Sequence, residues 1–103
     1  MPRVLVVDDQ KDVRAMVAIV LRVNHFDVVE AESGERALEL LEKFAFDVVI
    51  TDLRLPGIDG TQVIEAARER YPSIVAVVIT GYGTVKDAVA AIKRRAATRV
   101  SPH

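Results

Sequence analysis

Cysteine is absent from all 103 residues of the sequence, which excludes a disulfide framework and a thiolate metal site. Aromatic residues make up only 5% and tryptophan is missing, so the hydrophobic share of 50% is mainly aliphatic. A formal net charge of -1 supplies no general basic field for nucleic acid. No apolar run approaches the roughly 20 residues of a membrane span, and the N-terminus shows no basic lead before an apolar stretch. We therefore expect a cytoplasmic domain with no membrane segment and no direct contact with nucleic acid.

The apolar residues fall into alternating strand-like and helix-like segments. Four short runs rich in valine and isoleucine predict strands at residues 4–7, 26–31, 47–51 and 74–79. Apolar residues at a helical period follow each run, over residues 13–21, 33–44, 63–71 and 85–95. Connections of this length are too long for hairpins and imply right-handed βαβ units. We therefore predict one α/β domain, with a parallel sheet and helices on both of its faces.

Polar residues stand where three of these strands end. Asp8 and Asp9 follow the first strand, Asp52 follows the third and Thr80 follows the fourth. In an open α/β sheet, ligands bind beyond the carboxyl ends of the strands. Three carboxylates at one edge repel one another unless a divalent cation or a cationic side chain compensates. Mg²⁺ prefers such oxygen ligands, and a third carboxylate could be the nucleophile of aspartyl phosphorylation, with Thr80 bonded to the phosphoryl group.

Other polar residues have simpler interpretations. Asp47 opens the third strand, which is the wrong end of the sheet for this site. Asp59 and Gly60 are typical of a turn followed by a helix cap, and we assign His25 to a loop. For the adjacent acidic pair itself, a solvated strand end is the alternative interpretation.

Three segments carry a family resemblance. VLVVDDQKDVR, DVVITDLRLPGIDG and VVITGYGTVKDAVAAIKR resemble the receiver (phosphoacceptor) domain of two-component response regulators. The last segment is most similar to receivers of bacterial enhancer-binding transcriptional activators. The resemblance covers about residues 3–95. It implies a flavodoxin-like (CheY-like) doubly wound parallel sheet with strand order 2-1-3-4-5.

The resemblance also implies a role for each candidate residue. Asp52 would accept the phosphoryl group, and Asp8 and Asp9 would hold Mg²⁺ together with Asp52. The backbone carbonyl of Arg54 would be a further metal ligand, and Thr80 would be the switch hydroxyl. The phosphoryl donor and partner would be a histidine kinase.

The sequence departs from the family after Arg94. Residues 96–103 read AATRVSPH. The family lysine position reads Pro102, and the switch aromatic position reads Arg99. We therefore expect a single receiver domain over 1–103 with an atypical tail at 96–103, in which a fifth strand could begin but no last helix follows. This predicts impaired phosphotransfer to Asp52, and an uncovered apolar face that favours a homodimer or a domain-exchanged oligomer.

Two alternatives remain open beside a signalling receiver, which we expect not to be an enzyme. One is a truncated, non-signalling receiver fragment that keeps only the fold. The other is an Mg²⁺-dependent hydrolase with an aspartyl-phosphate intermediate. Such hydrolases usually carry the nucleophile after the first strand, with a second Asp two residues later. Here the two acids are adjacent and the expected acceptor follows the third strand, which disfavours the hydrolase.

Overall fold

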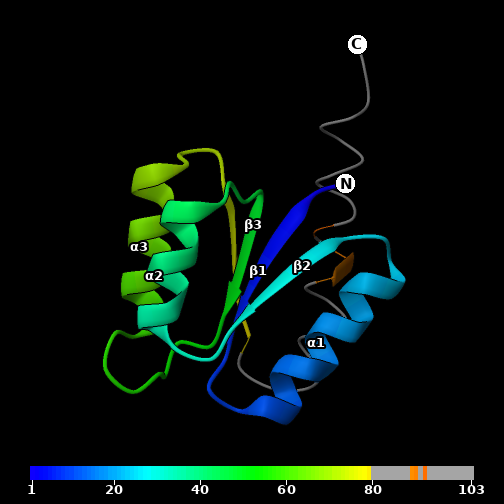
Figure 1. Cartoon of the computed structure of the whole chain (residues 1–103), viewed down its shortest axis with the longest axis horizontal. Coiled ribbons are helices and arrows are strands. Elements are labelled where there is room, and N and C mark those ends of the chain that lie inside the picture. The colour runs from blue at the N-terminus through cyan, green and yellow to red at the C-terminus, as the bar shows by residue number, and fades with distance from the viewer. Residues whose placement is uncertain (80–88, 91, 93–103) are drawn as a thin grey trace.

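The computed structural model describes residues 1–79, 89–90 and 92. Its elements are β1 (Arg3–Val7), α1 (Lys11–Val23), β2 (Asp27–Ala31), α2 (Gly34–Lys43), β3 (Val48–Thr51), α3 (Gly60–Arg70) and β4 (Val75–Val78). The four strands form one parallel sheet in the order β2-β1-β3-β4 (Figure 1). The CheY-like α/β fold and the first four places of the predicted strand order are thereby confirmed. The predictions for a fifth strand and for the tail 96–103 lie outside the described residues.

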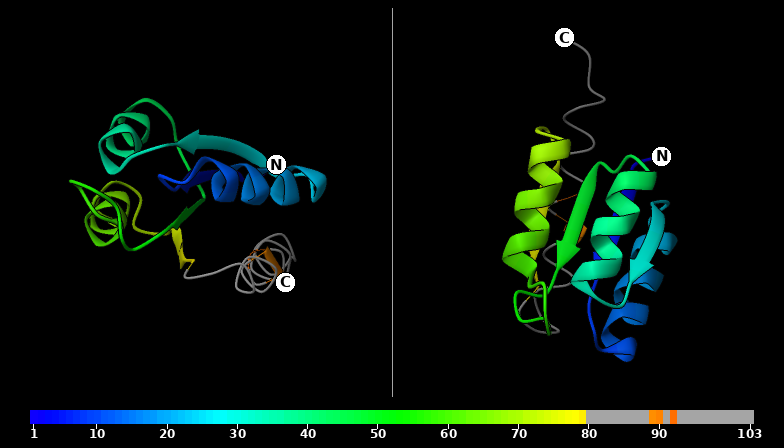
Figure 2. Two further views of the ribbon diagram at one scale, coloured as in Figure 1. Left: turned by 90° about the horizontal axis from the view of Figure 1, so that it is seen from below. Right: turned by 60° about the vertical axis from the view of Figure 1, so that its left-hand side comes forward.

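The helices cover both faces of the sheet (Figure 2). α1 packs on one face, in a buried cluster that contains Val4 and Val6 of β1. α2 and α3 cover the opposite face, in a second cluster that contains Leu5 and Val7. Successive side chains of a strand point to opposite faces, so the continuous apolar run of β1 is buried on both sides. This arrangement explains why the central strand carries only apolar residues between Arg3 and Asp8.

The helices lie close to their predicted positions. Asp59 caps α3 in a capping box with Gln62, as its place before Gly60 predicted. α3 ends at Arg70, ahead of Pro72. His25 lies in the loop after α1 with a φ of 68°. None of the helices in the described ranges is long and apolar enough to cross a membrane.

The helix predicted over residues 85–95 is described at only three positions. Val89, Ala90 and Ile92 are helical. Val89 and Ile92 are buried in the cluster on the α1 side of the sheet. These two apolar positions therefore contribute to the core, as their spacing predicted.

One detail of the predicted core is wrong. The helical period over residues 33–44 predicts that Phe44 lies on the apolar face of the second helix, but α2 ends at Lys43 and Phe44 is extended at its C-cap. The Phe44 side chain is 44% exposed, and the Arg3 guanidinium lies over its ring, 5.7 Å from the centroid. Leu40, one turn earlier on α2, is buried. The pattern of spacing extended past the point where the helix stops, so it assigned an exposed position to the core.

Candidate functional site

The acidic residues meet because β1 and β3 are neighbours in register. Val7 pairs with Thr51 at the carboxyl ends of the two strands. The pattern of hydrogen bonds between strands continues one residue past the end of each strand, to Asp8 and Asp52. The amide of Asp8 donates to the carbonyl oxygen of Ala31 at 3.2 Å, and that of Asp52 donates to Val7 at 3.2 Å. The sheet itself therefore fixes where the backbones of Asp8 and Asp52 lie.

The three predicted carboxylates form one cluster. One carboxylate oxygen from each of Asp8, Asp9 and Asp52 lies within 4.8 Å of the others. The three acids differ in solvent exposure. Asp8 is only 6% exposed, Asp52 is half-buried and Asp9 is exposed. A small ligand can therefore reach the cluster from the solvent side while one of its acids belongs to the protein interior. Thr80, the fourth predicted member, lies outside the described residues.

The environment of Asp8 disfavours its charge. Burial raises the pKa of Asp8, and the neighbouring carboxylates of Asp52 and Asp9 raise it further. Two groups act in the other direction, namely the Gln10 amide, which donates to Asp8 Oδ1 at 2.8 Å, and the Arg14 guanidinium. Burial and the neighbouring carboxylates together outweigh these two groups, so the pKa of Asp8 lies above its ordinary value. A bound cation would relieve this unfavourable charge.

Asp52 is oriented by the loop that follows it. The Arg54 backbone amide donates to Asp52 Oδ1 at 3.1 Å. Among the described residues, Asp52 Oδ2 accepts no hydrogen bond, so one oxygen is fixed while the other is available to a ligand. The Arg54 side chain is exposed. The role of the Arg54 backbone carbonyl as a metal ligand stays a prediction.

The start of α3 packs closely against the backbone of Asp52 and Leu53 at Gly60. A Cβ on Gly60 would meet the Asp52 carbonyl oxygen and would lie 2.8 Å from Cα of Leu53. The Gly60 amide donates to the Leu53 carbonyl at 3.0 Å, and the buried Thr51 hydroxyl donates to the Asp52 carbonyl at 2.8 Å. The sequence predicted only a turn at Gly60 and missed this packing role. The available signal was a glycine directly after a helix cap and eight positions after the acceptor.

The donor set fits a magnesium ion. Mg²⁺ takes hard oxygen ligands, is usually held by one or two carboxylates and keeps several waters. The cluster offers carboxylates that converge from two strands and remain open to solvent on one side. No histidine or cysteine belongs to it, which disfavours the softer transition metals. The described residues therefore provide the acidic part of a site for a hard divalent cation.

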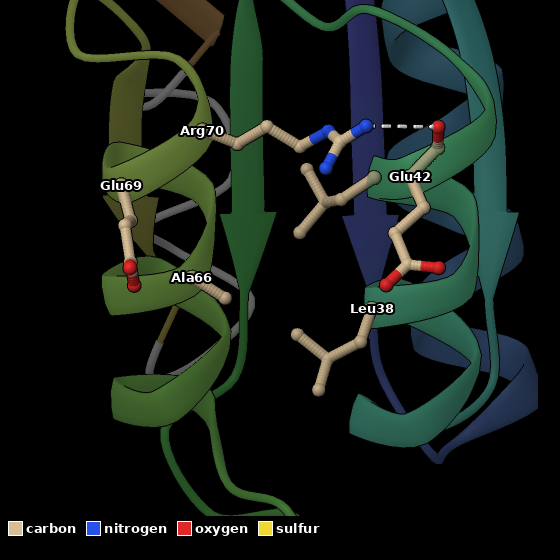
Figure 3. Close-up of a pocket in the computed structure, with 6 residues that line it drawn as sticks. Leu38, Glu42, Ala66, Glu69 and Arg70 are labelled. Carbon is tan, nitrogen blue, oxygen red and sulfur yellow. Dashed lines mark hydrogen bonds between the residues drawn. The ribbon is translucent and has the colours of Figure 1, made fainter.

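A second concave feature is separate from this cluster. A groove of about 400 Å³ lies between α2 and α3, and its lining contains none of the predicted site residues (Figure 3). Leu38 and Ala66 lie on its two sides, and Arg70 reaches across to donate to the Glu42 carbonyl at 3.2 Å. The groove therefore adds no ligand to the acidic site.

Comparison with known proteins identifies the family. Residues 4–101 match the response regulator receiver domain. The chain belongs to this family, as the resemblance of its three segments predicted. The response regulator protein FleR of Pseudomonas aeruginosa is 37% identical over 95 residues, which make up 92% of this chain and 20% of FleR. The chain thus spans about a fifth of the length of FleR and of several other curated relatives.

Solved structures agree with this assignment. The response regulator TrrA of Thermotoga maritima, crystallised in complex with Mg²⁺ and BeF, has a TM-score of 0.74 at 25% identity. That match covers 88% of this chain and 98% of TrrA. A chain from the crystal structure of histidine kinase ThkA in complex with TrrA has a TM-score of 0.71 at 33% identity, covering 80% of this chain and 71% of that one.

Proposed function

We propose that this receiver domain accepts a phosphoryl group on Asp52 in two-component signal transduction, with a histidine kinase as donor and Mg²⁺ as cofactor. The observation that carries the proposal is the convergence of Asp8, Asp9 and Asp52 at the carboxyl edge of the sheet. TrrA supports both parts, because it was crystallised with Mg²⁺ and BeF and with a histidine kinase. In this proposal Asp8, Asp9 and Asp52 hold the metal, and the Arg54 carbonyl is a further ligand.

In the proposed transfer step, the phosphoryl group moves from an imidazole nitrogen of the kinase to a carboxylate oxygen of Asp52. A carboxylate oxygen of Asp52 forms a bond to phosphorus while the bond between phosphorus and the donor imidazole nitrogen breaks. The electron pair of that bond leaves with the imidazole, which regains its proton from water. The Arg54 amide holds Asp52 Oδ1, so Oδ2 is the oxygen that we assign as the nucleophile. Bound Mg²⁺ would supply charge neutralisation for the phosphoryl oxygens.

Two finer points belong to the same proposal. The domain acts as a stoichiometric acceptor rather than as an enzyme that turns over phosphate esters, and Thr80 bonds the phosphoryl group after transfer. Transfer is slow, because residues 94–103 contain no lysine and Pro102 stands at the family's lysine position. Loss of one preorganised donor to developing charge costs on the order of 3 kcal/mol of transition-state stabilisation.

The test is labelling of the full chain with a small phosphodonor. We expect slow incorporation of one phosphoryl group per chain, dependent on Mg²⁺ and lost in Asp52→Asn. Asp47→Asn is the matched control, since Asp47 lies at the opposite end of the same strand and should leave labelling unchanged. Labelling that persists in Asp52→Asn would contradict the assignment of the acceptor.

Other outcomes separate the alternatives. Repeated turnover of a generic phosphate ester, lost in Asp52→Asn, would indicate the hydrolase instead. Rapid stoichiometric labelling would contradict only the slow transfer. No labelling in the presence of Mg²⁺ would indicate a fragment that keeps the fold but not the signalling function.

Self-association is a further part of the proposal. Ile19 and Val23 lie four residues apart on α1 and are both exposed, so they occupy one helical face. Exposed apolar groups of this kind support a homodimer or a domain-exchanged oligomer. We expect light scattering to show a mass above that of the monomer at high concentration, and a monomer at every concentration would argue against it.

A further inference from the structure

Arg14 connects the acidic site to the edge of the sheet. Its Nη1 donates to the backbone carbonyl oxygen of Asp8 at 2.8 Å. Its Nε donates to Glu30 Oε1 of β2 at 3.2 Å. The Arg14 side chain is only 15% exposed, so both bonds are shielded from solvent and compete weakly with water. The guanidinium thus joins α1, the loop after β1, and β2.

The carbonyl that Arg14 holds belongs to the peptide between Asp8 and Asp9. The preceding peptide is already fixed, because the Asp8 amide donates to Ala31 in the strand pairing. The Asp8 side chain is fixed by the Gln10 amide at 2.8 Å. Arg14 therefore determines the one orientation that these bonds leave open, that of the peptide plane between Asp8 and Asp9. That plane sets where Cα of Asp9 lies, and so the direction in which the Asp9 side chain leaves the backbone relative to Asp8.

Glu30 gives Arg14 a fixed anchor. Its other carboxylate oxygen, Oε2, lies 3.5 Å from Nη1 of Arg22. Arg22 also donates to the Val28 carbonyl at 3.3 Å. Glu30 is thus held between two arginines of the same helix, one on each oxygen. Of these two arginines, Arg14 reaches the acidic site, whereas the Arg22 side chain is 51% exposed and its partners among the described residues lie on β2.

We propose that Arg14 is a positioning residue for the cation site. It holds the Asp8–Asp9 peptide plane so that both carboxylates converge with Asp52. Its partners among the described residues are the Asp8 carbonyl oxygen and Glu30, rather than a carboxylate of the cluster, so it acts through the Asp8 backbone. This inference rests on the proposed function, because it assumes that the cluster binds Mg²⁺.

The positive charge of Arg14 and its positioning role predict opposite changes in Mg²⁺ affinity when Arg14 is replaced. A positive guanidinium near the carboxylates repels an incoming cation, and it lowers the pKa of Asp8. If charge alone mattered, Arg14→Gln would bind Mg²⁺ more tightly. If Arg14 positions the two acids, the same change weakens binding, because outer contacts that orient ligands typically contribute about 10–100-fold in metal affinity. The sign of the change therefore separates the two effects.

The experiment titrates the full chain with Mg²⁺ alone and follows backbone amide NMR signals, including those of Asp9 and Asp52. We expect Arg14→Gln to weaken Mg²⁺ binding about tenfold. Arg22→Gln is the matched control, since it removes an arginine from the same helix and the same glutamate, and its affinity should stay within about twofold of the wild type. Arg14→Lys keeps the charge but loses the planar fork, so it should also bind less tightly than the wild type.

The outcomes are distinguishable. Binding by Arg14→Gln that equals or exceeds that of the wild type overturns the positioning role. An equal loss in Arg22→Gln also overturns it, because the effect would then come from α1 in general. The same spectra report folding, and if Arg14→Gln is unfolded, Arg14→Lys decides: unchanged affinity there rejects the inference. A wild-type chain that does not bind Mg²⁺ overturns the proposed function itself.

Discussion

The two ends of the same sheet treat their acidic residues differently. At the amino end, Arg3 satisfies both nearby acids. Its guanidinium lies 3.0 Å from Asp27, and its backbone amide donates to Asp47 Oδ2 at 2.9 Å. The guanidinium also covers the ring of Phe44. Each acid at this end has a partner supplied by the chain itself.

At the carboxyl end, the acids outnumber their partners. Asp8, Asp9 and Asp52 converge, and among the described residues no cationic side chain forms an ion pair with any of them. Arg14 is close, but it gives its donors to a backbone carbonyl and to Glu30. The comparison teaches that a count of acids does not identify a site. What identifies it is a group of acids to which the described part of the chain supplies no ion pair.

The largest stability effect should come from crowding the carboxyl end. In Gly60→Ala, the new Cβ would meet the Asp52 carbonyl and the backbone of Leu53. We expect a loss of about 1–3 kcal/mol in the free energy of unfolding, measured by urea denaturation. Thr61→Ala is the control, because Thr61 is exposed on the same helix, and it should change stability by less than about 0.5 kcal/mol. A fully stable Gly60→Ala would show that α3 can move away from Asp52.

Removing one charge from the carboxyl end should stabilise the chain. Asp8→Asn keeps an oxygen that can accept from the Gln10 amide but removes a buried charge beside two others. In EDTA we expect the free energy of unfolding to rise by about 1 kcal/mol, as for other stabilising substitutions. Added Mg²⁺ should stabilise the wild type by mass action and the variant much less. The comparison between the two ends fails if Asp8→Asn is less stable than the wild type without metal.

The difference in stability between the wild type and Asp8→Asn should depend on pH. The folded-state pKa of Asp8 lies above its ordinary value of 3.8, so the folded chain retains a proton that the unfolded chain releases. The contribution of Asp8 to stability therefore falls as the pH rises from about 3.8 through the folded pKa, and then stays constant. We expect the wild type to lose stability relative to Asp8→Asn over that interval in EDTA. A stability difference that stays flat with pH would contradict the burial of a charged Asp8.

The smallest change in the free energy of unfolding should come from a substitution at the amino end of the sheet. Arg3 and Asp27 are both well exposed, so their ion pair is screened by solvent. We expect Arg3→Ala to lower the free energy of unfolding by less than about 1 kcal/mol and to leave Mg²⁺ binding unchanged. Calorimetry with and without Mg²⁺ measures both quantities. A changed metal response would mean that the two ends of the sheet are coupled.

The sequence predicted the parts of the site that depend on strand ends. Asp52 and Asp47 flank the same short strand, and the direction of a parallel strand alone separates the site residue from the structural one. The capping role of Asp59 followed from its place before Gly60, because local hydrogen bonding decides it. The neighbouring positions of β1 and β3 came from the family resemblance, since periodicity does not order the strands of a sheet.

Other features depend on details that a sequence pattern does not contain. Helical spacing brings Arg14 near the end of β1, but its bond to the Asp8 carbonyl depends on the rotamer of a long side chain and on the position of β2. Phe44 continued an apolar pattern after the backbone of α2 had already left the helix. The packing of Gly60 on Asp52 depends on how α3 approaches β3. In each case the deciding contact lies between segments distant in the chain.

The pairing of β1 with β3 has a consequence for the order of folding events. Asp8 and Asp9 are separated from Asp52 along the chain by α1, β2, α2 and β3. A folding intermediate that contains only β1, α1 and β2 has two of the acids and lacks the third. Closing that long loop is a non-local step, and the complete cation site exists only after it. In the proposed function, binding of a divalent ion would therefore mark the moment at which β3 joins the sheet.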